Sequence, residues 1–214
     1  MPDGVTSEEV PVADDDNRRT PVTPRGARTR QALIDAARVV FERDGYLDAR
    51  LTDITAEARC STGSFYTYFT GKEEIFAAVM EMTKNEMLHP GVARVNEDDD
   101  PAAVIAASNR GYFESYRRNA KLMQLMEQVA NVDPRVREVR QERARAFVER
   151  NARGIADLQE RGLVDRDLDP LVASWALSSM VSRMAFSAFV LHEIPDGDHL
   201  VDTCTRLWCN ALRL

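Results

Sequence analysis

The sequence predicts an all-α protein with a three-helix N-terminal domain and a larger helical C-terminal domain. Apolar residues recur at the spacing of an amphipathic helix, first at Leu33, Ala36, Ala37, Val40 and Phe41. The dipeptide Asp-Pro occurs three times ahead of such a segment, and an N-cap followed by a first-turn proline is typical of a helix start. No stretch of useful length alternates apolar and polar residues, and only 7% of residues are aromatic, which disfavours a fold of many short strands.

The first 24 residues are expected to form a disordered acidic tail. They contain six acidic and two basic side chains, a net charge of −4, and no periodic apolar pattern. Residues 25–72 carry eight basic and six acidic side chains, a net charge of +2. Because the whole chain has a net charge of −7, any contact with nucleic acid must be local.

Four helices are expected in the N-terminal part. Gly45 ends the first by supplying a left-handed residue, Thr52 and Ser61 are the expected N-caps of two short helices, and Thr70-Gly71 breaks the chain before the fourth. Their expected bounds are from near Arg28 to Asp44, from Thr52 through Ala58, from Thr62 to Phe69, and from Lys72 to about Met87.

Five more helices are expected beyond a connection formed by His89-Pro90-Gly91 and the acidic run 97–100. Asp-Pro opens three of them, and Gly162 closes the third of the five. Their expected bounds are 101–118, 121–130, 134–161, 170–192 and 198–213. The expected domains are the tail 1–24, the N-terminal domain 25–75 and the C-terminal domain 76–214.

The segment Leu171–Leu191 is long and apolar enough to suggest a membrane-spanning helix. Arg183 lies just past its middle, which costs about 2.5–3.5 kcal/mol on insertion scales, and five serines recur through it. A helix buried between its own domain and a partner subunit is therefore expected. Three cysteines and the absence of a secretory signal favour a reduced, cytoplasmic chain.

Residues 52–74 are the most informative stretch, because two short helices joined by a tight turn describe a helix-turn-helix. The second helix of such a motif enters the major groove, and the first helix braces the phosphate backbone. Small and hydroxylic residues permit close approach and hydrogen bonds to base edges, whereas phenols and an ammonium suit phosphates. The candidate DNA-binding residues are Arg28, Thr52, Ser61, Thr62, Gly63, Ser64, Tyr66, Thr67, Tyr68 and Lys72. Of these, Thr62, Ser64 and Thr67 are expected at bases or in the groove, and Tyr66, Tyr68 and Lys72 at phosphates.

The run from Ser61 to Phe69, followed by Lys72-Glu73-Glu74-Ile75, resembles the DNA-binding signature of the TetR/AcrR transcriptional regulators. Thr52-Asp53-Ile54 and the helix end at Asp44-Gly45 fit the same pattern. The resemblance covers about Thr29 to Met80, roughly a quarter of the chain. It implies a homodimeric repressor of a palindromic double-stranded DNA operator, although activation in place of repression stays open.

The resemblance also implies that a small molecule binds the C-terminal domain and releases the DNA, with the helix from Lys72 to Met87 as lever. The last two helices would form the dimer interface. Methionine and aromatic side chains make adaptable apolar walls, so a largely hydrophobic inducer is expected. The candidate ligand-binding residues are Met80, Met87, Phe113, Tyr116, Met123, Met126, Phe147, Trp175, Met180 and Met184. The alternative for each of them is a place in the core.

Two positions depart from the family pattern. Arg59 replaces the usual turn glycine, which costs about 1 kcal/mol if φ is positive and could reshape the turn or add a phosphate contact. Cys60 replaces an apolar residue and is expected to be a small hydrophobe, with a redox-sensing thiol as the alternative. Arg28 and Arg30 are expected to precede the first helix. They could form a basic arm that reaches a phosphate or the minor groove, or they could lie in solvent.

No catalytic constellation is found in the sequence. The three histidines form no metal-spaced pair, Cys204 and Cys209 are too far apart for a Cys-x-x-Cys site, and the run 97–100 lacks calcium-loop spacing. No phosphate loop or nucleophile elbow occurs, so neither an enzyme nor a cofactor or metal is expected. A helical adaptor without sequence-specific DNA binding is the alternative function.

Overall fold

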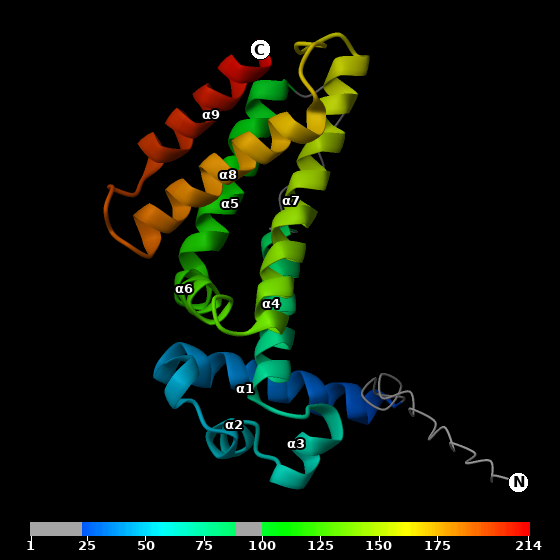
Figure 1. Ribbon diagram of the computed structural model, residues 1–214, viewed down its shortest axis with the longest axis vertical. Helices are drawn as coiled ribbons and strands as arrows, with labels where there is room; N and C mark the ends of the chain where they lie inside the picture. The colour runs from blue at the N-terminus through cyan, green and yellow to red at the C-terminus, as the bar shows by residue number, and fades with distance from the viewer. Residues whose placement is uncertain (1–22, 89–99) are drawn as a thin grey trace, which may run out of the picture.

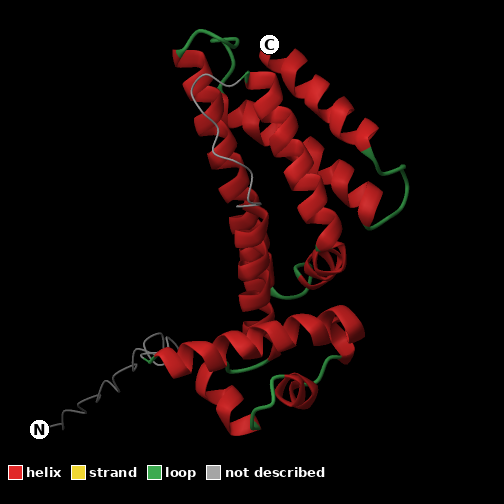
Figure 2. Ribbon diagram, turned by 180° about the vertical axis from the view of Figure 1, so that it is seen from behind, coloured by secondary structure: helices red, strands yellow, loops and turns green. Residues whose placement is uncertain are grey.

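The computed structural model describes residues 23–88 and 100–214, and this part of the chain is all-α (Figures 1 and 2). It contains nine helices and no strand, as the sequence predicts. The predicted acidic tail and the connection at 89–99 lie outside the described residues, apart from Thr23, Pro24 and Asp100 at their borders.

The first helix, α1 (Pro24–Asp48), begins earlier than expected. The Thr23 hydroxyl caps it by accepting a hydrogen bond from the Gly26 amide, and Pro24 occupies the first turn. Arg28 and Arg30 therefore lie inside the helix and do not form an arm in front of it. Gly45 interrupts the helix at φ 80°, where the sequence places its end.

The next two helices are short. Arg50, and not Thr52 as expected, is the N-cap residue of α2 (Leu51–Glu57), and no side chain caps this helix. Ser61 caps α3 (Thr62–Tyr68) as expected, and α4 (Lys72–Leu88) then carries the chain out of the N-terminal domain. The predicted three-helix domain is present, although its first helix is longer than predicted.

Five helices make up the C-terminal domain. The three aspartates of the Asp-Pro pairs each accept a hydrogen bond from a first-turn amide, so local capping fixes these starts as predicted. The helices are α5 (Pro101–Arg118), α6 (Ala120–Val129), α7 (Pro134–Glu160), α8 (Pro170–Phe189) and α9 (Asp198–Leu212).

Helix α4 links the two domains. In Figure 1 it rises from α1, which lies across α2 and α3, and it runs beside α7 in the upper domain. Helix α7 also packs on α8, and α5 packs on α9. One apolar core runs through both domains, from Leu33 in α1 to Leu212 in α9, so motion of α4 is mechanically coupled to both.

Within residues 23–88 and 100–214, none of the helices combines the length and apolar character needed to cross a lipid bilayer.

Candidate functional site

The turn between α2 and α3 keeps the geometry of a glycine turn although it contains Arg59. Arg59 has φ 52°, its amide donates to the Ala56 carbonyl (3.1 Å), and the Cys60 amide donates to the Thr55 carbonyl (3.0 Å). This pair of hydrogen bonds is the Schellman motif that ends helices. The turn is therefore not reshaped, and the exposed Arg59 side chain accepts a left-handed backbone at a cost of about 1 kcal/mol.

A serine pair holds the first turn of α3. The Ser61 hydroxyl accepts a hydrogen bond from the Ser64 amide (3.1 Å), and the two hydroxyl oxygens lie 3.0 Å apart. The cap leaves the N-terminal end of α3 ordered and accessible, because Ser61 and Thr62 are both exposed.

The predicted DNA-reading residues of α3 share an exposed face. Thr62, Gly63, Tyr66 and Thr67 are exposed, and Ser64 and Tyr68 are half-buried. Opposite them, Phe65 is fully buried beside Phe69, with ring centres 5.7 Å apart. The apolar face thus anchors α3, and the polar face is free to meet another surface.

Neither the space around Gly63 nor its backbone conformation requires glycine at this position. A Cβ built at this position would meet only the Ser61 hydroxyl, at an ordinary contact distance of 3.8 Å, and its φ is not positive. Glycine inside a helix costs about 1 kcal/mol relative to alanine. Its presence on the exposed face is consistent with the close approach of another molecule.

Lys72 lies at the start of α4 but is engaged within the protein. Its ammonium donates to the carbonyls of Leu47 (3.0 Å) and Ala49 (3.2 Å) and lies 4.9 Å from the centre of the Tyr46 ring. These contacts tie α4 to the α1–α2 connection. Burial, helped by nearby Glu73, raises the pKa of the Tyr46 phenol. One N–H of the ammonium remains for an outside acceptor.

The two remaining candidate DNA-binding residues lie on the neighbouring helices α1 and α2. Arg28 is exposed in the first turns of α1 and donates to the Pro24 carbonyl (3.3 Å), and Thr52 is exposed in the first turn of α2. Arg30, which lies over the Phe69 ring (5.1 Å), holds the start of α1 beside the end of α3. Arg50, exposed at the start of α2, is a further cation that is not among the predicted DNA-binding residues, although basic character beside the motif was a signal for it.

The C-terminal domain contains a cavity of about 570 Å³ between α5, α7, α8 and α9. Of the ten predicted ligand-binding residues, Tyr116, Phe147 and Trp175 line it. The other seven do not belong to its lining. They are Met80, Met87, Phe113, Met123, Met126, Met180 and Met184.

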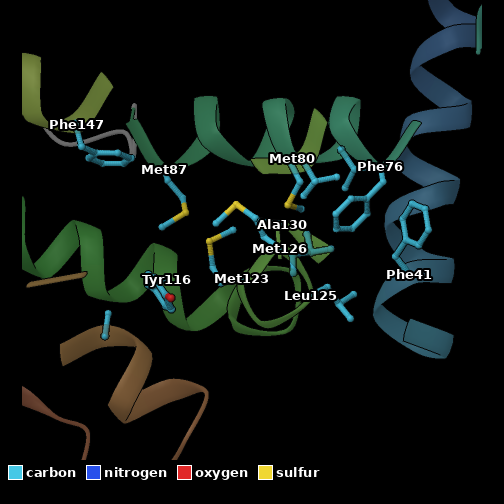
Figure 3. Packing of buried hydrophobic residues seen from close by; sticks show 14 of the residues in the cluster. Phe41, Phe76, Met80, Met87, Tyr116, Met123, Leu125, Met126, Ala130 and Phe147 are labelled. Atoms are coloured by element: carbon cyan, nitrogen blue, oxygen red, sulfur yellow. The ribbon is translucent and has the colours of Figure 1, made fainter. Parts of the chain in front are cut away.

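Most of these methionines belong to the core. Figure 3 shows Met80 and Met87 of α4 and Met123 and Met126 of α6 gathered between the two helices. All four are at most 2% exposed. Methionine spacing is the same for a pocket wall and for a helix–helix interface, which is why the sequence could not separate them.

The cavity is more polar than the sequence predicts. Four arginines and two acidic residues line it, namely Arg143, Arg150, Arg161, Arg183, Glu127 and Asp157. Asn151 and several serines add neutral polar groups, and the Asn151 amide donates to the Ser178 hydroxyl (3.0 Å). A purely hydrophobic ligand would offer these polar groups no hydrogen bonds.

Two of these arginines reach from the cavity to the end of α4. Arg150 donates to the Leu88 carbonyl (3.1 Å), and Arg143 donates to the Met87 sulfur (3.5 Å). Burial lowers the pKa of the Arg150 guanidinium. The last turn of α4 is thus held by side chains that also face the cavity.

Arg38 joins three helices where the domains meet. Its guanidinium donates to both carboxylate oxygens of Glu86 (3.1 and 3.0 Å), to Glu42 (3.1 Å) and to the side-chain oxygen of the buried Asn119 (2.8 Å). It therefore connects α1, α4 and the α5–α6 junction. Hydrogen bonds and charge from the two glutamates raise the pKa of Arg38 against the opposing effect of burial, which is the largest single contribution.

The cysteines have no arrangement that suggests reactivity. Cys60 is half-buried against the core, and burial raises the pKa of its thiol, as it does for Cys204 and Cys209. A redox-sensing thiol needs a lowered pKa, so the small-hydrophobe interpretation of Cys60 is favoured. No metal-binding group of three or more His, Cys, Asp or Glu occurs within residues 23–88 and 100–214.

Helices α8 and α9 expose large apolar side chains on the outer surface of the C-terminal domain. Val172 is 65% exposed and Leu207 46% exposed, and Leu171 and Trp175 lie on α8 with similar exposure. Single exposed apolar residues are ordinary on a protein surface. Several of them on two neighbouring helices at the outside of the domain indicate a surface suited to a partner.

Comparison with known proteins assigns both domains. Residues 33–79 match the family described as "Bacterial regulatory proteins, tetR family", and residues 105–213, just over half of the chain, match "Transcriptional regulator EthR, C-terminal domain". The chain is 44% identical over 52 residues to the HTH-type transcriptional regulator SrpR of Pseudomonas putida, covering 24% of each protein. The chain spans 21–45% of the length of the curated relatives it matches.

The solved structures that it resembles extend over both domains. Salmonella enterica GusR superposes with a TM-score of 0.73 at 17% identity, covering 91% of this chain and 100% of that one. SmeT, the repressor of the Stenotrophomonas maltophilia multidrug efflux pump SmeDEF, superposes with a TM-score of 0.67 at 23% identity, covering 85% and 89%. The family consists of DNA-binding regulators and not of enzymes. With a helix-turn-helix at 51–68 and a family match to each domain, this chain belongs to the TetR family of bacterial transcriptional regulators.

Proposed function

We propose that the protein is a homodimeric repressor that binds a palindromic operator through α3 and leaves it when a small molecule occupies the C-terminal cavity. The observation that carries this proposal is the exposed polar face of α3, which is presented by a buried phenylalanine pair and a serine cap. The repressor would act in the cytoplasm, on the chromosome.

Two groups of residues have separate roles at the DNA. Thr62, Ser64 and Thr67 meet base edges or the groove, and Gly63 allows the helix backbone to approach closely. Tyr66, which is 58% exposed, donates its phenol to a phosphate, together with Tyr68 and the remaining N–H of Lys72. The other candidates support the same contact from neighbouring helices, at Arg28, Thr52 and Ser61.

The dimer is built on the apolar surface of α8 and α9. A two-fold axis through this surface places the same residues of both protomers against each other. The two α3 helices then reach successive major grooves, so the operator is a palindrome with half-sites about one helical turn apart or a multiple of it.

Ligand response follows from the contacts at the end of α4. A molecule that engages Arg143 or Arg150 changes what holds Met87 and Leu88, and α4 transmits the change to the N-terminal domain. The ligand shifts the population toward a conformer whose two α3 helices do not match successive grooves.

Selection from a random duplex library with the purified protein tests the DNA-binding part of this proposal. The selected duplex is then titrated at two salt concentrations, because neutralised phosphates give a steep salt dependence. A palindrome bound by two protomers is the expected result. Weak binding with no consensus would contradict the proposal and favour the adaptor alternative.

Variants separate the two groups of DNA contacts. Tyr66→Phe is expected to weaken binding similarly on selected and random duplexes, whereas Thr62→Ala and Ser64→Ala are expected to change which duplex is preferred. Equal losses on both kinds of DNA for the last two variants would contradict their assignment to base or groove contacts.

A further inference from the structure

Arg143 is a buried cation in the wall of the cavity. It lies on α7, and the residue is only 7% exposed. Its guanidinium donates one hydrogen bond to the Tyr112 hydroxyl (3.3 Å) and one to the Met87 sulfur (3.5 Å), and its Nε has no hydrogen-bond partner. Thioether sulfur is a weak acceptor, so most of the five N–H donors of this guanidinium are unused.

No carboxylate neutralises this charge in the described part of the chain. The two acidic residues that line the cavity are already paired, Glu127 with Arg140 (2.9 Å) and Asp157 with Arg161 (3.4 Å), and none lies within 4 Å of Arg143. A buried guanidinium without a carboxylate partner is energetically unfavourable.

Aromatic rings supply part of the missing stabilisation. The Arg143 guanidinium lies 5.3 Å from the centre of the Phe147 ring and 5.9 Å from that of Tyr116. The ring faces stabilise the positive charge, but they accept no hydrogen bond from the N–H groups that lie in the plane of the guanidinium. The donors are therefore available to an acceptor that enters the cavity.

Apolar side chains also line the cavity, beside the polar groups described above. These are Val104, Ile105, Ile155, Leu158, Trp208 and Leu212. Arg143 and Leu158 are separated by about 22 Å along the axis of α7, given a rise of 1.5 Å per residue. A volume of 570 Å³ over that length makes the cavity long and narrow.

We propose that this cavity binds an amphipathic organic anion, with its carboxylate on Arg143 and its extended apolar body along α7 toward Leu158 and Trp208. The guanidinium matches a carboxylate with two parallel N–H···O bonds, which neither a neutral nor a cationic head group can accept in the same way. This inference rests on the proposed function, because it names the chemical class of the ligand that would release the DNA.

Binding can be measured directly, because both tryptophans of the chain, Trp175 and Trp208, line the cavity. Their fluorescence is followed while the full chain is titrated with dodecanoate, 1-dodecanol or dodecylammonium, each below its micelle concentration. Dodecanoate is expected to bind at least tenfold more tightly than 1-dodecanol, and dodecylammonium more weakly than both. Equal affinity for dodecanoate and dodecanol, or no binding of dodecanoate, would overturn the proposal.

Variants at Arg143 assign the head-group site. Arg143→Met is expected to weaken dodecanoate binding at least tenfold and to leave 1-dodecanol binding within about twofold. Arg145→Met, an exposed position on the same helix outside the cavity, is the matched control and should change neither. Arg143→Lys keeps the charge but loses the planar fork, so an intermediate loss is expected. Circular dichroism selects the variants that fold, and unchanged dodecanoate affinity in either folded Arg143 variant would overturn the proposal.

The titration contains no DNA, so it can succeed or fail independently of the operator selection. Dodecanoate binding with no operator would contradict the proposed function alone. An operator without dodecanoate binding would contradict the ligand class alone.

Discussion

The Lys72 ammonium lies 4.9 Å from the centre of the Tyr46 ring while it donates hydrogen bonds to the Leu47 and Ala49 carbonyls. A lysine that the sequence assigns to a phosphate therefore also fixes the start of α4 against the end of α1. The same side chain can serve the DNA contact and the geometry that presents it.

Lys72→Met is expected to lower the free energy of unfolding by about 1–2 kcal/mol, because two charge-assisted hydrogen bonds are lost. DNA affinity should fall to a similar degree on selected and random duplexes. Denaturant titration and binding titration measure the two effects. Lys121→Met, at an exposed position of α6, is the control and should change neither; an unfolding free energy unchanged by Lys72→Met would contradict the structural role.

Gly63→Ala is expected to separate stability from DNA binding. The added Cβ has room, so stability should stay constant or rise by up to about 1 kcal/mol. Operator affinity should fall, because the methyl group stands between the helix backbone and the DNA. Gly154→Ala, where no atom lies within 4 Å of the new Cβ, is the matched control for thermal melting and for binding. Undiminished operator affinity of Gly63→Ala would argue against close approach at this position.

Arg59→Gly is expected to stabilise the α2–α3 turn by about 1 kcal/mol, because glycine adopts φ 52° without strain. If the exposed guanidinium contacts a phosphate, the slope of log affinity against log salt should also decrease by about 1. His192→Gly, which relieves φ 55° after α8, should stabilise the protein without changing that slope. An unaltered slope for Arg59→Gly would show that Arg59 makes no phosphate contact.

Arg38→Met is expected to lower the free energy of unfolding by about 2–3 kcal/mol, because the Glu86 carboxylate and the side-chain oxygen of the buried Asn119 both lose a charged hydrogen-bond donor. The loss occurs where α1, α4 and the α5–α6 junction meet, so the two domains should also unfold less cooperatively. Calorimetry and denaturant titration test both effects. Arg43→Met, which removes an exposed pair with Asp44 on the same helix, should leave stability unchanged.

Val172→Asp and Leu207→Asp are expected to convert the dimer to monomers, because each places a charge in the proposed interface. Operator affinity should fall at least tenfold, since a monomer engages one half-site. Sedimentation velocity gives the oligomeric state. Val132→Asp, at an exposed residue between α6 and α7, should stay dimeric; dimers of the first two variants would place the interface elsewhere.

The amino-acid sequence by itself determined the helices and the exposed polar face of α3. Asp-Pro pairs, the Ser61 cap and Gly45 act within a few residues, so their effect on the backbone does not depend on distant packing. The turn pattern left open whether Arg59 reshapes the turn, and the structure shows that it keeps the glycine geometry at φ 52°. The start of α1 was predicted too late, because the cap Thr23 lies in a segment whose composition favours disorder.

Only the tertiary structure decided which side chains face the cavity and which fill the core. Met80, Met87, Met123 and Met126 have the spacing expected of a pocket wall, yet they are buried in the core between α4 and α6 (Figure 3). In the sequence, Arg143 is one of several arginines on a charged helix. Its burial depends on residues of α4 and α5 that pack against it. Contacts between residues far apart in the chain cannot be read from local periodicity, because they depend on how the helices cross.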